Sequence, residues 1–256
     1  MSEHKTTIIA FTGKGGVGKT SISAITVRLL REAYPDKKIL AIDADPAVGL
    51  STALGVEVTS TVDDIRKLFI EHVEDGDAKT ALEMLGEAKY QLFDALVEVH
   101  DIYFLAIGRP ESAGCYCKVN SYLKEVINNI ASNFDYVVID GEAGIEQVNR
   151  RVMEKVTHLI LVSDASKKGL QVVQTIEHVA EDLVMFDKSG LIINRIVNMD
   201  YADQLDTGDL KVLALIPDDK VMTESDMMGQ DIFSMNEEAT IVKKTKEALK
   251  NMDILK

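Results

Sequence analysis

The sequence is poor in cysteine, proline and basic residues. Its 256 residues include two cysteines and four prolines, so a disulfide-stapled scaffold is excluded and no proline-rich linker divides the chain. Lysine and arginine total 28 against 42 aspartates and glutamates, which gives a formal net charge of −14. This balance argues against a surface that coats DNA or RNA. We therefore expect a single domain over residues 1–256 and no nucleic-acid partner.

Long apolar runs are also absent. No stretch reaches the roughly 18–20 residues that a membrane-spanning helix needs. The polar start of the chain, residues 1–7, lacks the apolar core and cleavage site of a signal peptide. We expect a cytoplasmic protein without stable membrane association. The 46% of apolar and 27% of charged residues are typical of a folded globular chain.

Short apolar runs alternate with helical patterns along the chain. The runs lie at residues 6–11, 38–43, 101–107, 134–140, 159–162, 191–193 and 212–216, and helical periods at 20–32, 119–131 and 169–186. Continuous apolar strands separated by helices predict an α/β fold, with a mostly parallel sheet covered by helices on both faces. In such a sheet, functional residues gather at the carboxyl ends of the strands.

An acidic stretch interrupts this alternation at about residues 57–101. It contains 12 acidic and 4 basic residues, a net charge of −8. Apolar side chains at helical spacing predict an amphipathic helix pair inserted between strands; they are Leu82, Leu85, Leu92, Leu96 and Val99. The insertion either forms a solvated cover on the sheet or serves as a lid or partner-docking element.

A phosphate-binding loop follows the first strand. Residues Gly13–Thr20 fit the pattern G-x-x-x-x-G-K-[ST], with a strand before them and a helix after them. Glycine backbones bring N–H groups close to phosphate oxygens, and the helix dipole favours the anion. Lys19 is suited to neutralise the β- and γ-phosphates, and Thr20 to offer a hydroxyl to Mg²⁺. The predicted nucleotide contacts are Gly13, Gly15, Gly16, Val17, Gly18, Lys19, Thr20 and Ser21.

Acidic residues end the second and fourth predicted strands. Asp43 and Asp45 lie two residues apart, so in extended chain they point the same way. One can hold the water shell of Mg²⁺ while the other orients the attacking water; the alternative is a pair that caps the next helix. Asp140 begins Asp-Gly-Glu-Ala-Gly after the fourth strand. With a phosphate loop upstream, this pattern predicts a magnesium-binding aspartate and a switch loop.

A second lysine in the loop, Lys14, distinguishes this motif from an ordinary phosphate loop and indicates a particular family of P-loop proteins. The pattern K-G-G-x-G-K-[ST] resembles the deviant Walker A P-loop family, which includes nitrogenase iron protein, arsenite-pump ATPases and the MinD and ParA positioning ATPases. The resemblance implies a homodimer formed on ATP binding, with Lys14 reaching the partner's nucleotide as a catalytic cation. It also implies that Asp45 activates water and that Asp43 and Asp140 serve the magnesium. Residues expected around the adenine are Asn194, Arg195, Pro217 and Asp219.

The two cysteines, Cys115 and Cys117, lie in a predicted loop before the helix at 119–131. Thiols at positions i and i+2 of an extended chain can both face one ion. Two ligands are too few for a stable Zn²⁺ or Ni²⁺ site, but a two-fold dimer supplies four thiolates. The alternative is a pair of ordinary reduced thiols.

The combination of this thiol pair with the deviant Walker A motif resembles the CooC-type ATPases over nearly the whole chain. That resemblance implies nickel delivery into carbon monoxide dehydrogenase or acetyl-CoA synthase, driven by ATP. Two rival functions remain. A MinD/ParA-type positioning ATPase would bind a membrane or DNA as its ATP dimer. An iron–sulfur reductase or scaffold ATPase is disfavoured, because such relatives use cysteines far apart in sequence or in C-x-x-C.

Overall fold

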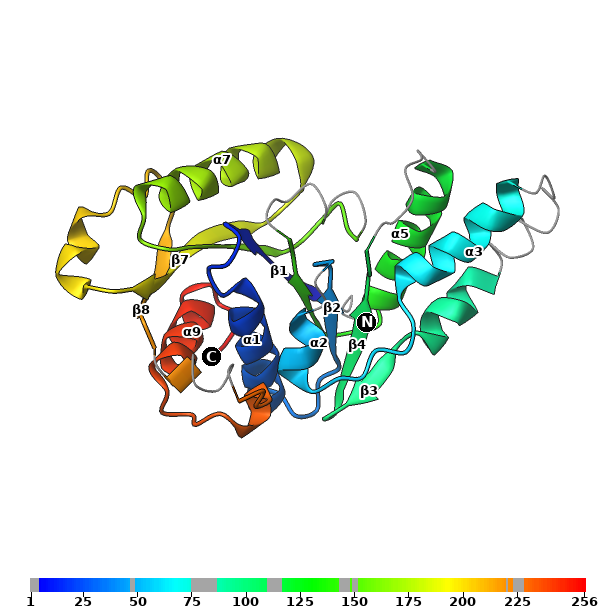
Figure 1. The fold of residues 1–256 in the computed structure, drawn as a ribbon, viewed down its shortest axis with the longest axis horizontal. Helices are drawn as coiled ribbons and strands as arrows, with labels where there is room; N and C mark the ends of the chain where they lie inside the picture. Colours follow the sequence, from blue (N-terminus) through cyan, green and yellow to red (C-terminus); the bar gives the residue numbers. More distant parts are fainter. Residues whose placement is uncertain are drawn as a thin grey trace.

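A computed structural model describes residues 5–46, 49–74, 87–109, 117–142, 148, 152–219, 221–222 and 228–256. Within these residues, one eight-stranded sheet crosses the molecule in the order β3-β4-β2-β5-β1-β6-β7-β8. All neighbouring strands are parallel except β3 and β4. Helices lie on both faces of the sheet (Figure 1). The predicted α/β fold with a mostly parallel sheet is therefore confirmed.

The bounds of the elements follow the sequence pattern closely. The strands are β1 (Thr7–Gly13), β2 (Ile39–Asp43), β3 (Val97–Val99), β4 (Ile102–Ala106), β5 (Tyr136–Asp140), β6 (His158–Ser163), β7 (Lys188–Ile196) and β8 (Val212–Pro217). The helices are α1 (Lys19–Ala33), α2 (Gly49–Leu54), α3 (Val62–Glu74), α5 (Cys117–Ala131), α7 (Lys167–Leu183) and α9 (Thr240–Asn251), with short 3-10 helices η1 (Met199–Gln204) and η2 (Ile232–Ser234). Each of the seven apolar runs lies largely within a strand.

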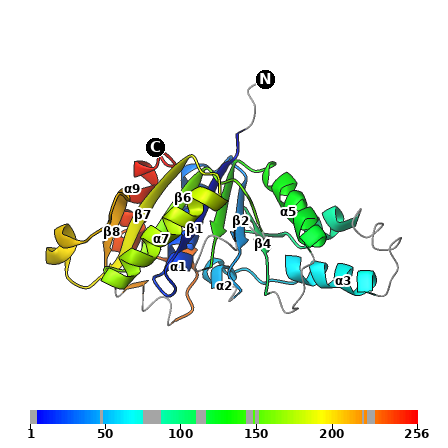
Figure 2. The ribbon, with the colours of Figure 1, turned by 90° about the horizontal axis from the view of Figure 1, so that it is seen from above.

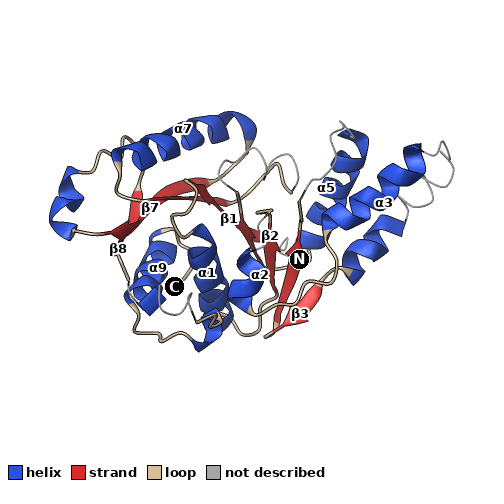
Figure 3. Ribbon diagram, viewed as in Figure 1, coloured by secondary structure: helices blue, strands red, loops and turns tan. Residues whose placement is uncertain are grey.

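Two helical layers enclose the sheet. One contains α1, α2 and α9, and the other contains α3, α5 and α7 (Figures 2 and 3). Successive residues of a strand face opposite layers: Ile9 and Phe11 pack in the core that includes α1 and α9, while Ala10 packs in the core that includes α5. Burial from both sides explains why the strands have continuous rather than alternating apolar sequences.

The helical prediction is wrong at the end of the acidic insertion. The insertion does contain two helical segments, α3 and residues 87–94, but Val99 belongs to strand β3, which pairs antiparallel with β4. His100 and Asp101 connect the two strands with positive φ angles of 50° and 59°. This tight turn returns the chain along β4, so strand pairing overrides the helical spacing. Leu82 and Leu85 lie outside the described residues.

Candidate nucleotide-binding site

The phosphate loop joins β1 to α1 at the centre of the carboxyl edge of the sheet. Gly13 has φ +139°, and a Cβ on it would lie 2.0 Å from the carbonyl oxygen of Val162 in the neighbouring β6. Gly18 precedes α1 with φ +92°, and a Cβ there would lie 2.7 Å from the side-chain amide of Asn194. Larger residues would disrupt both positions, because neither the conformation nor the space accommodates a side chain.

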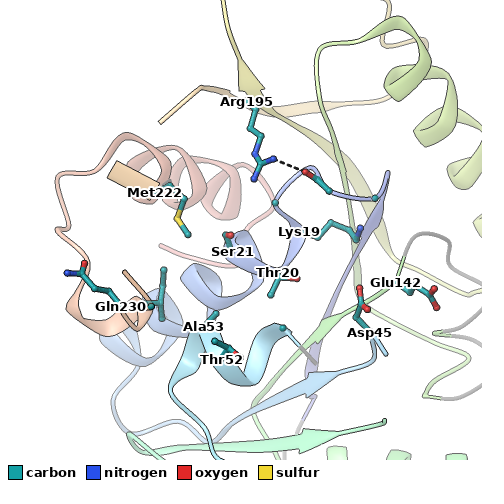
Figure 4. Close-up of a pocket in the computed structure, with 16 residues that line it drawn as sticks. Lys19, Thr20, Ser21, Asp45, Thr52, Ala53, Glu142, Arg195, Met222 and Gln230 are labelled. Carbon is teal, nitrogen blue, oxygen red and sulfur yellow. Dashed lines mark hydrogen bonds between the residues drawn. The ribbon is translucent and has the colours of Figure 1, made fainter. Parts of the chain in front are cut away.

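Beside this loop lies a cavity of about 660 Å³, a size typical of small-molecule sites. Figure 4 shows the side chains around it, with Lys19, Asp45 and Glu142 on one side and Met222 and Gln230 on the other. Its described lining residues are Gly15, Gly16, Gly18, Lys19, Thr20, Ser21, Asp45, Gly49, Thr52, Ala53, Glu142, Arg195, Met222, Gly229, Gln230 and Ile232. Of the predicted loop contacts, Gly13 and Val17 are not among them.

Lys19 is the cation at the head of α1. Its side chain is largely buried, and its Nζ donates a hydrogen bond to the carbonyl oxygen of Lys14 at 3.0 Å. Burial lowers the pKa of Lys19, while the charges of Asp140, Asp45 and Glu142 oppose that shift. A cation poised among carboxylates at a helix N-terminus is suited to bind a polyanion such as a triphosphate.

Two of the predicted magnesium residues lie side by side in the sheet. Asp43 and Asp140 end the neighbouring strands β2 and β5 and are direct partners in the register. Burial and the charge of Asp140 raise the pKa of Asp43 to about 7. Burial raises the pKa of Asp140 to about 6, although neighbouring hydroxyls and the Lys19 ammonium partly offset it. Both buried carboxylates therefore hold protons more tightly than usual, despite the Lys19 ammonium near Asp140.

The two acids differ in what they contact. Asp43 accepts backbone hydrogen bonds from Asp45 at 3.2 Å and from Leu50 at 2.9 Å, so it caps the turn into α2. Asp140 accepts a hydrogen bond from the Ser23 hydroxyl at 3.0 Å through Oδ1, while its buried Oδ2 has no hydrogen-bond partner in the structure described. An orphaned carboxylate oxygen close to Thr20 fits a hydrated Mg²⁺. Asp140 thus suits the metal role, while Asp43 also makes the capping contacts of the alternative, and its part in magnesium binding stays a prediction.

Replacing Asp140 with asparagine should stabilise the nucleotide-free protein. The folded-state pKa of about 6 lies above the ordinary value of 3.8, so the wild type loses stability as the pH rises through this range. The variant should have a free energy of unfolding higher by about 1–3 kcal/mol near pH 8, with the gain vanishing near pH 4. Urea unfolding at both pH values measures this, with exposed Asp203→Asn as the control. A gain that does not depend on pH would contradict the assignment.

Asp45 does not share the environment of Asp43. The sequence predicts that both carboxylates point the same way, but the strand ends at Asp43 and the chain bends at Asp45. Asp45 lines the cavity, together with Glu142 two residues beyond Asp140. Glu142 was not predicted as a site residue, although its place in the Asp-Gly-Glu motif could have indicated it. Two carboxylates therefore reach the cavity near Lys19 (Figure 4).

Asn194 and Arg195 brace the phosphate loop from the end of β7. The amide of Asn194 is buried and donates a hydrogen bond to the carbonyl oxygen of Val17 at 2.8 Å. The Arg195 guanidinium donates to the carbonyl oxygen of Gly16 at 2.8 Å, the dashed contact in Figure 4. Arg195 has a positive φ of 57°, and such strain in a residue other than glycine is concentrated at functional sites. In this structure, Asn194 and Arg195 therefore hold the phosphate loop in position.

Of the described residues predicted to surround the adenine, Asn194, Arg195 and Asp219 line a cavity, and Pro217 does not. A small hollow of about 70 Å³ adjoins the main one and is lined by Asn194, Arg195 and Asp219, among others. The Asp219 carboxylate also accepts backbone hydrogen bonds from Val221 at 3.0 Å and Ile241 at 3.1 Å. Pro217 ends β8 and is not among the described lining residues of either hollow.

Lys14 faces away from the cavity that its own loop forms. Its Nζ contacts Asp164 Oδ2 at 2.5 Å and the Ser166 hydroxyl at 3.4 Å, both just before α7. The side chains of Lys14 and Asp164 are 30% and 29% exposed, respectively. In this structure Lys14 is thus a partly exposed cation held by Asp164, and it is not among the described residues that line the cavity beside its own loop.

The far wall of the cavity comes from a segment that the sequence did not indicate. Residues 228–232 lie beside α1 because the buried Arg28 guanidinium donates to the carbonyl oxygens of Ile232 at 3.1 Å and Met235 at 2.6 Å. Arg28 comes from α1, the helix that begins at the phosphate loop. One helix thus positions both ends of the cavity.

The predicted thiol site lies largely outside the described residues. Cys115 is not described, and Cys117 is the first residue of α5 rather than part of a loop before it. The described portion of the chain contains no group of three or more histidine, cysteine or acidic residues placed to hold a metal ion. Among the same residues, no helix is long and apolar enough to cross a membrane.

Comparisons with known proteins agree with this site. The AAA_31 family (AAA domain) matches residues 5–188. The chain is 35% identical to an uncharacterized ATP-binding protein of Methanocaldococcus jannaschii, over 94% of this chain and 96% of that protein. It is 30% identical to the carbon monoxide dehydrogenase accessory protein CooC of Rhodospirillum rubrum, over 89% and 90%.

Solved structures share the fold. The septum site-determining protein MinD from Pyrococcus horikoshii OT3, determined as a complex with Mg-ADP, superposes with a TM-score of 0.67. The superposition covers 97% of this chain and 96% of that one, at 24% sequence identity. The eight-stranded sheet with helices on both faces is therefore an arrangement that MinD structures share.

Proposed function

The chain belongs to the AAA_31 family and is a P-loop ATP hydrolase, and from this premise we propose that MgATP drives a dimerisation cycle that delivers nickel to a client enzyme. The observation that carries the dimeric cycle is the position of Lys14. It lies on the phosphate loop yet outside the cavity, at the surface and in contact with Asp164. A cation there is placed to reach a nucleotide bound to another copy, as an arginine finger does.

The residues that line the cavity have different roles in ATP hydrolysis. Lys19 and the loop backbone bind the β- and γ-phosphates, Thr20 and Asp140 hold Mg²⁺, and Asp45 orients the attacking water. Bound magnesium would neutralise charge on the phosphate oxygens. Positioning and charge neutralisation account for catalysis of this kind, because the protein forms no covalent bond to the phosphoryl group. The negative charge on the phosphates is fully neutralised only when Lys14 of a second copy reaches them. The lone protomer therefore hydrolyses ATP slowly.

Nickel is proposed as the cargo because two features coincide. The chain resembles CooC, whose name assigns it to carbon monoxide dehydrogenase, over most of both sequences. Its only two thiols, Cys115 and Cys117, are separated by a single residue. Two copies provide four thiolates, a set suited to Ni²⁺ or Zn²⁺. The client would be carbon monoxide dehydrogenase or acetyl-CoA synthase.

Removing both thiols should abolish metal binding. We expect one Ni²⁺ or Zn²⁺ ion per dimer in the wild type and none in Cys115→Ala/Cys117→Ala, because no thiolates remain. Titration of each metal into ATP-bound, ADP-bound and nucleotide-free protein, with the mass measured in parallel, tests this. Met228→Ala, which removes an exposed sulfur at the other end of the chain, is the control. Unchanged stoichiometry in the double variant would refute the thiol site.

A positioning function of the MinD/ParA type is the second candidate, favoured by the shared fold. Its membrane form would need a free amphipathic segment. The apolar residues of α9, including Ile241, Val242 and Leu249, are instead buried in the core with α1. ATP-dependent co-sedimentation with lipid vesicles or DNA would favour this candidate over metal delivery.

A further inference from the structure

The connection from β7 to β8 exposes an unusual apolar surface. Residues 197–209, here called the crossover segment, protrude at one end of the molecule and contain η1, the yellow helix at the left of Figures 1 and 2. Val197 is 92% exposed, Tyr201 60% and Met199 42%. Three large apolar side chains within five residues form a patch of the kind that marks interaction sites, and tyrosine and methionine are enriched in protein interfaces.

A groove lies directly beside this patch. It has a volume of about 420 Å³, and its apolar lining comes from Ala165, Ile196, Val197, Tyr201, Ala202 and Leu205. A second hollow of about 320 Å³ continues it between α7 and η1, since Ala165 and Leu205 line both. The amide of Gln174 in α7 donates to the carbonyl oxygen of Asp206 at 3.1 Å. The groove is therefore formed by two elements bonded to each other.

The crossover segment, which forms one wall of the groove, is acidic, and its Asp206 lines the second hollow. Asp200, Asp203, Asp206 and Asp209 are all exposed, and no basic residue lies among them in the crossover segment. We refer to these four residues as the acidic rim. Lys167 and Lys168 at the start of α7, together with Arg195 in the groove, supply three positive charges, so the four carboxylates of the rim still exceed them by one. Negative charge on one wall of an apolar groove complements a positively charged partner.

The groove also contacts the residues that hold the phosphate loop. Arg195, which donates to the carbonyl oxygen of Gly16, lines both the groove and the nucleotide cavity. Asp164, which holds Lys14, lines the groove as well. A ligand in the groove would therefore touch the two side chains that fix the loop and its second lysine.

From this arrangement, we propose that the groove binds a basic segment of another protein, which inserts an apolar side chain between α7 and η1. Lysines or arginines of that segment pair with the acidic rim, while Tyr201 and Leu205 contact the inserted side chain. Binding at Asp164 and Arg195 couples the partner to the nucleotide cycle. Of the described residues that line the groove, Arg195 alone also lines the nucleotide cavity.

A peptide-display library of random twelve-residue sequences provides the probe. Selection on the wild-type protein should enrich peptides that combine lysine or arginine with a large apolar residue. Binding of a selected peptide, measured by fluorescence anisotropy, should weaken about tenfold or more in Tyr201→Ala, since removal of an interface anchor commonly has this effect. Asp200→Lys/Asp203→Lys should weaken it similarly and remove its salt dependence.

Matched controls come from equally exposed positions elsewhere. Tyr90 is 71% exposed in the acidic insertion, so Tyr90→Ala should leave peptide binding unchanged. The same holds for Asp36→Lys/Asp182→Lys, which alters two exposed acids outside the crossover segment. All variants should bind ATP as the wild type does, and peptide binding is measured without hydrolysis, so failure of the groove is distinguishable from failure of the ATPase cycle.

Two results would overturn the proposal. One is a selection in which no enriched peptide loses affinity in Tyr201→Ala or in the rim variant. The other is loss of ATP-dependent dimerisation, seen by mass, in Tyr201→Ala alone, because the surface would then be an interface between copies of this chain.

Discussion

Replacing Lys14 with alanine is expected to prevent the variant from pairing with itself on ATP binding and to lower its hydrolysis rate about 100-fold or more, as loss of a cation supplied in trans does in other phosphoryl-transfer enzymes. ATP affinity of the monomer should change little, since Lys14 does not line its own cavity. Mass measurement with and without ATP, nucleotide titration and phosphate release test the three parts separately.

Lys37→Ala is the matched control for this variant. Lys37 also pairs with an aspartate of its own chain, Asp135, at 2.8 Å. This pair lies at the amino ends of strands β2 and β5, whereas the phosphate loop lies at the carboxyl ends of the strands. It should dimerise and hydrolyse ATP like the wild type. A Lys14→Ala protein that still dimerises and retains full activity would show that the Lys14–Asp164 pair is only a structural contact.

Replacing Asp45 with asparagine should separate binding from hydrolysis. The side chain lines the cavity close to Lys19, and asparagine preserves its shape without the basic oxygen that orients water. We expect ATP binding and dimerisation to persist while hydrolysis falls about 100-fold or more, within the range for a lost catalytic base. The variant should therefore accumulate as an ATP-bound dimer, which mass measurement and nucleotide extraction would detect.

Glu142→Gln is the sharpest comparison for this prediction. Glu142 lines the same cavity and carries the same charge, so both substitutions remove one carboxylate near Lys19. If Asp45 orients the water, Glu142→Gln retains most of the activity. A larger loss in Glu142→Gln than in Asp45→Asn would transfer the role to Glu142.

The parts of the site that are local in sequence could be predicted from it. The phosphate loop lies between β1 and α1 because its glycines, lysine and threonine act within eight residues, and short-range geometry decides their arrangement. The same holds for Asp140, whose strand pattern and terminal acid are contiguous. The seven apolar runs became strands because burial on both faces needs no information beyond the run itself.

Features that depend on distant residues were missed. Val99 has helical spacing, but β3 forms because β4 offers a pairing edge after the turn at His100 and Asp101. The contact between Lys14 and Asp164 joins residues 150 positions apart. The hydrogen bond from the Asn194 amide to the carbonyl oxygen of Val17 joins residues 177 positions apart. No sequence pattern encodes such contacts, because they follow from the order of strands in the sheet.

The most direct test of the account mixes two inactive proteins, Lys14→Ala and Asp45→Asn, and measures ATP hydrolysis. In a mixed dimer, the intact Lys14 of the Asp45→Asn copy can reach the site of the Lys14→Ala copy, which still holds its Asp45. An equimolar mixture should recover up to about a quarter of wild-type activity, one competent site in half of the dimers, as the two-fold symmetry requires. A mixture in which mass measurement detects mixed dimers, but which is no more active than its two components, would show that Lys14 does not act across a dimer.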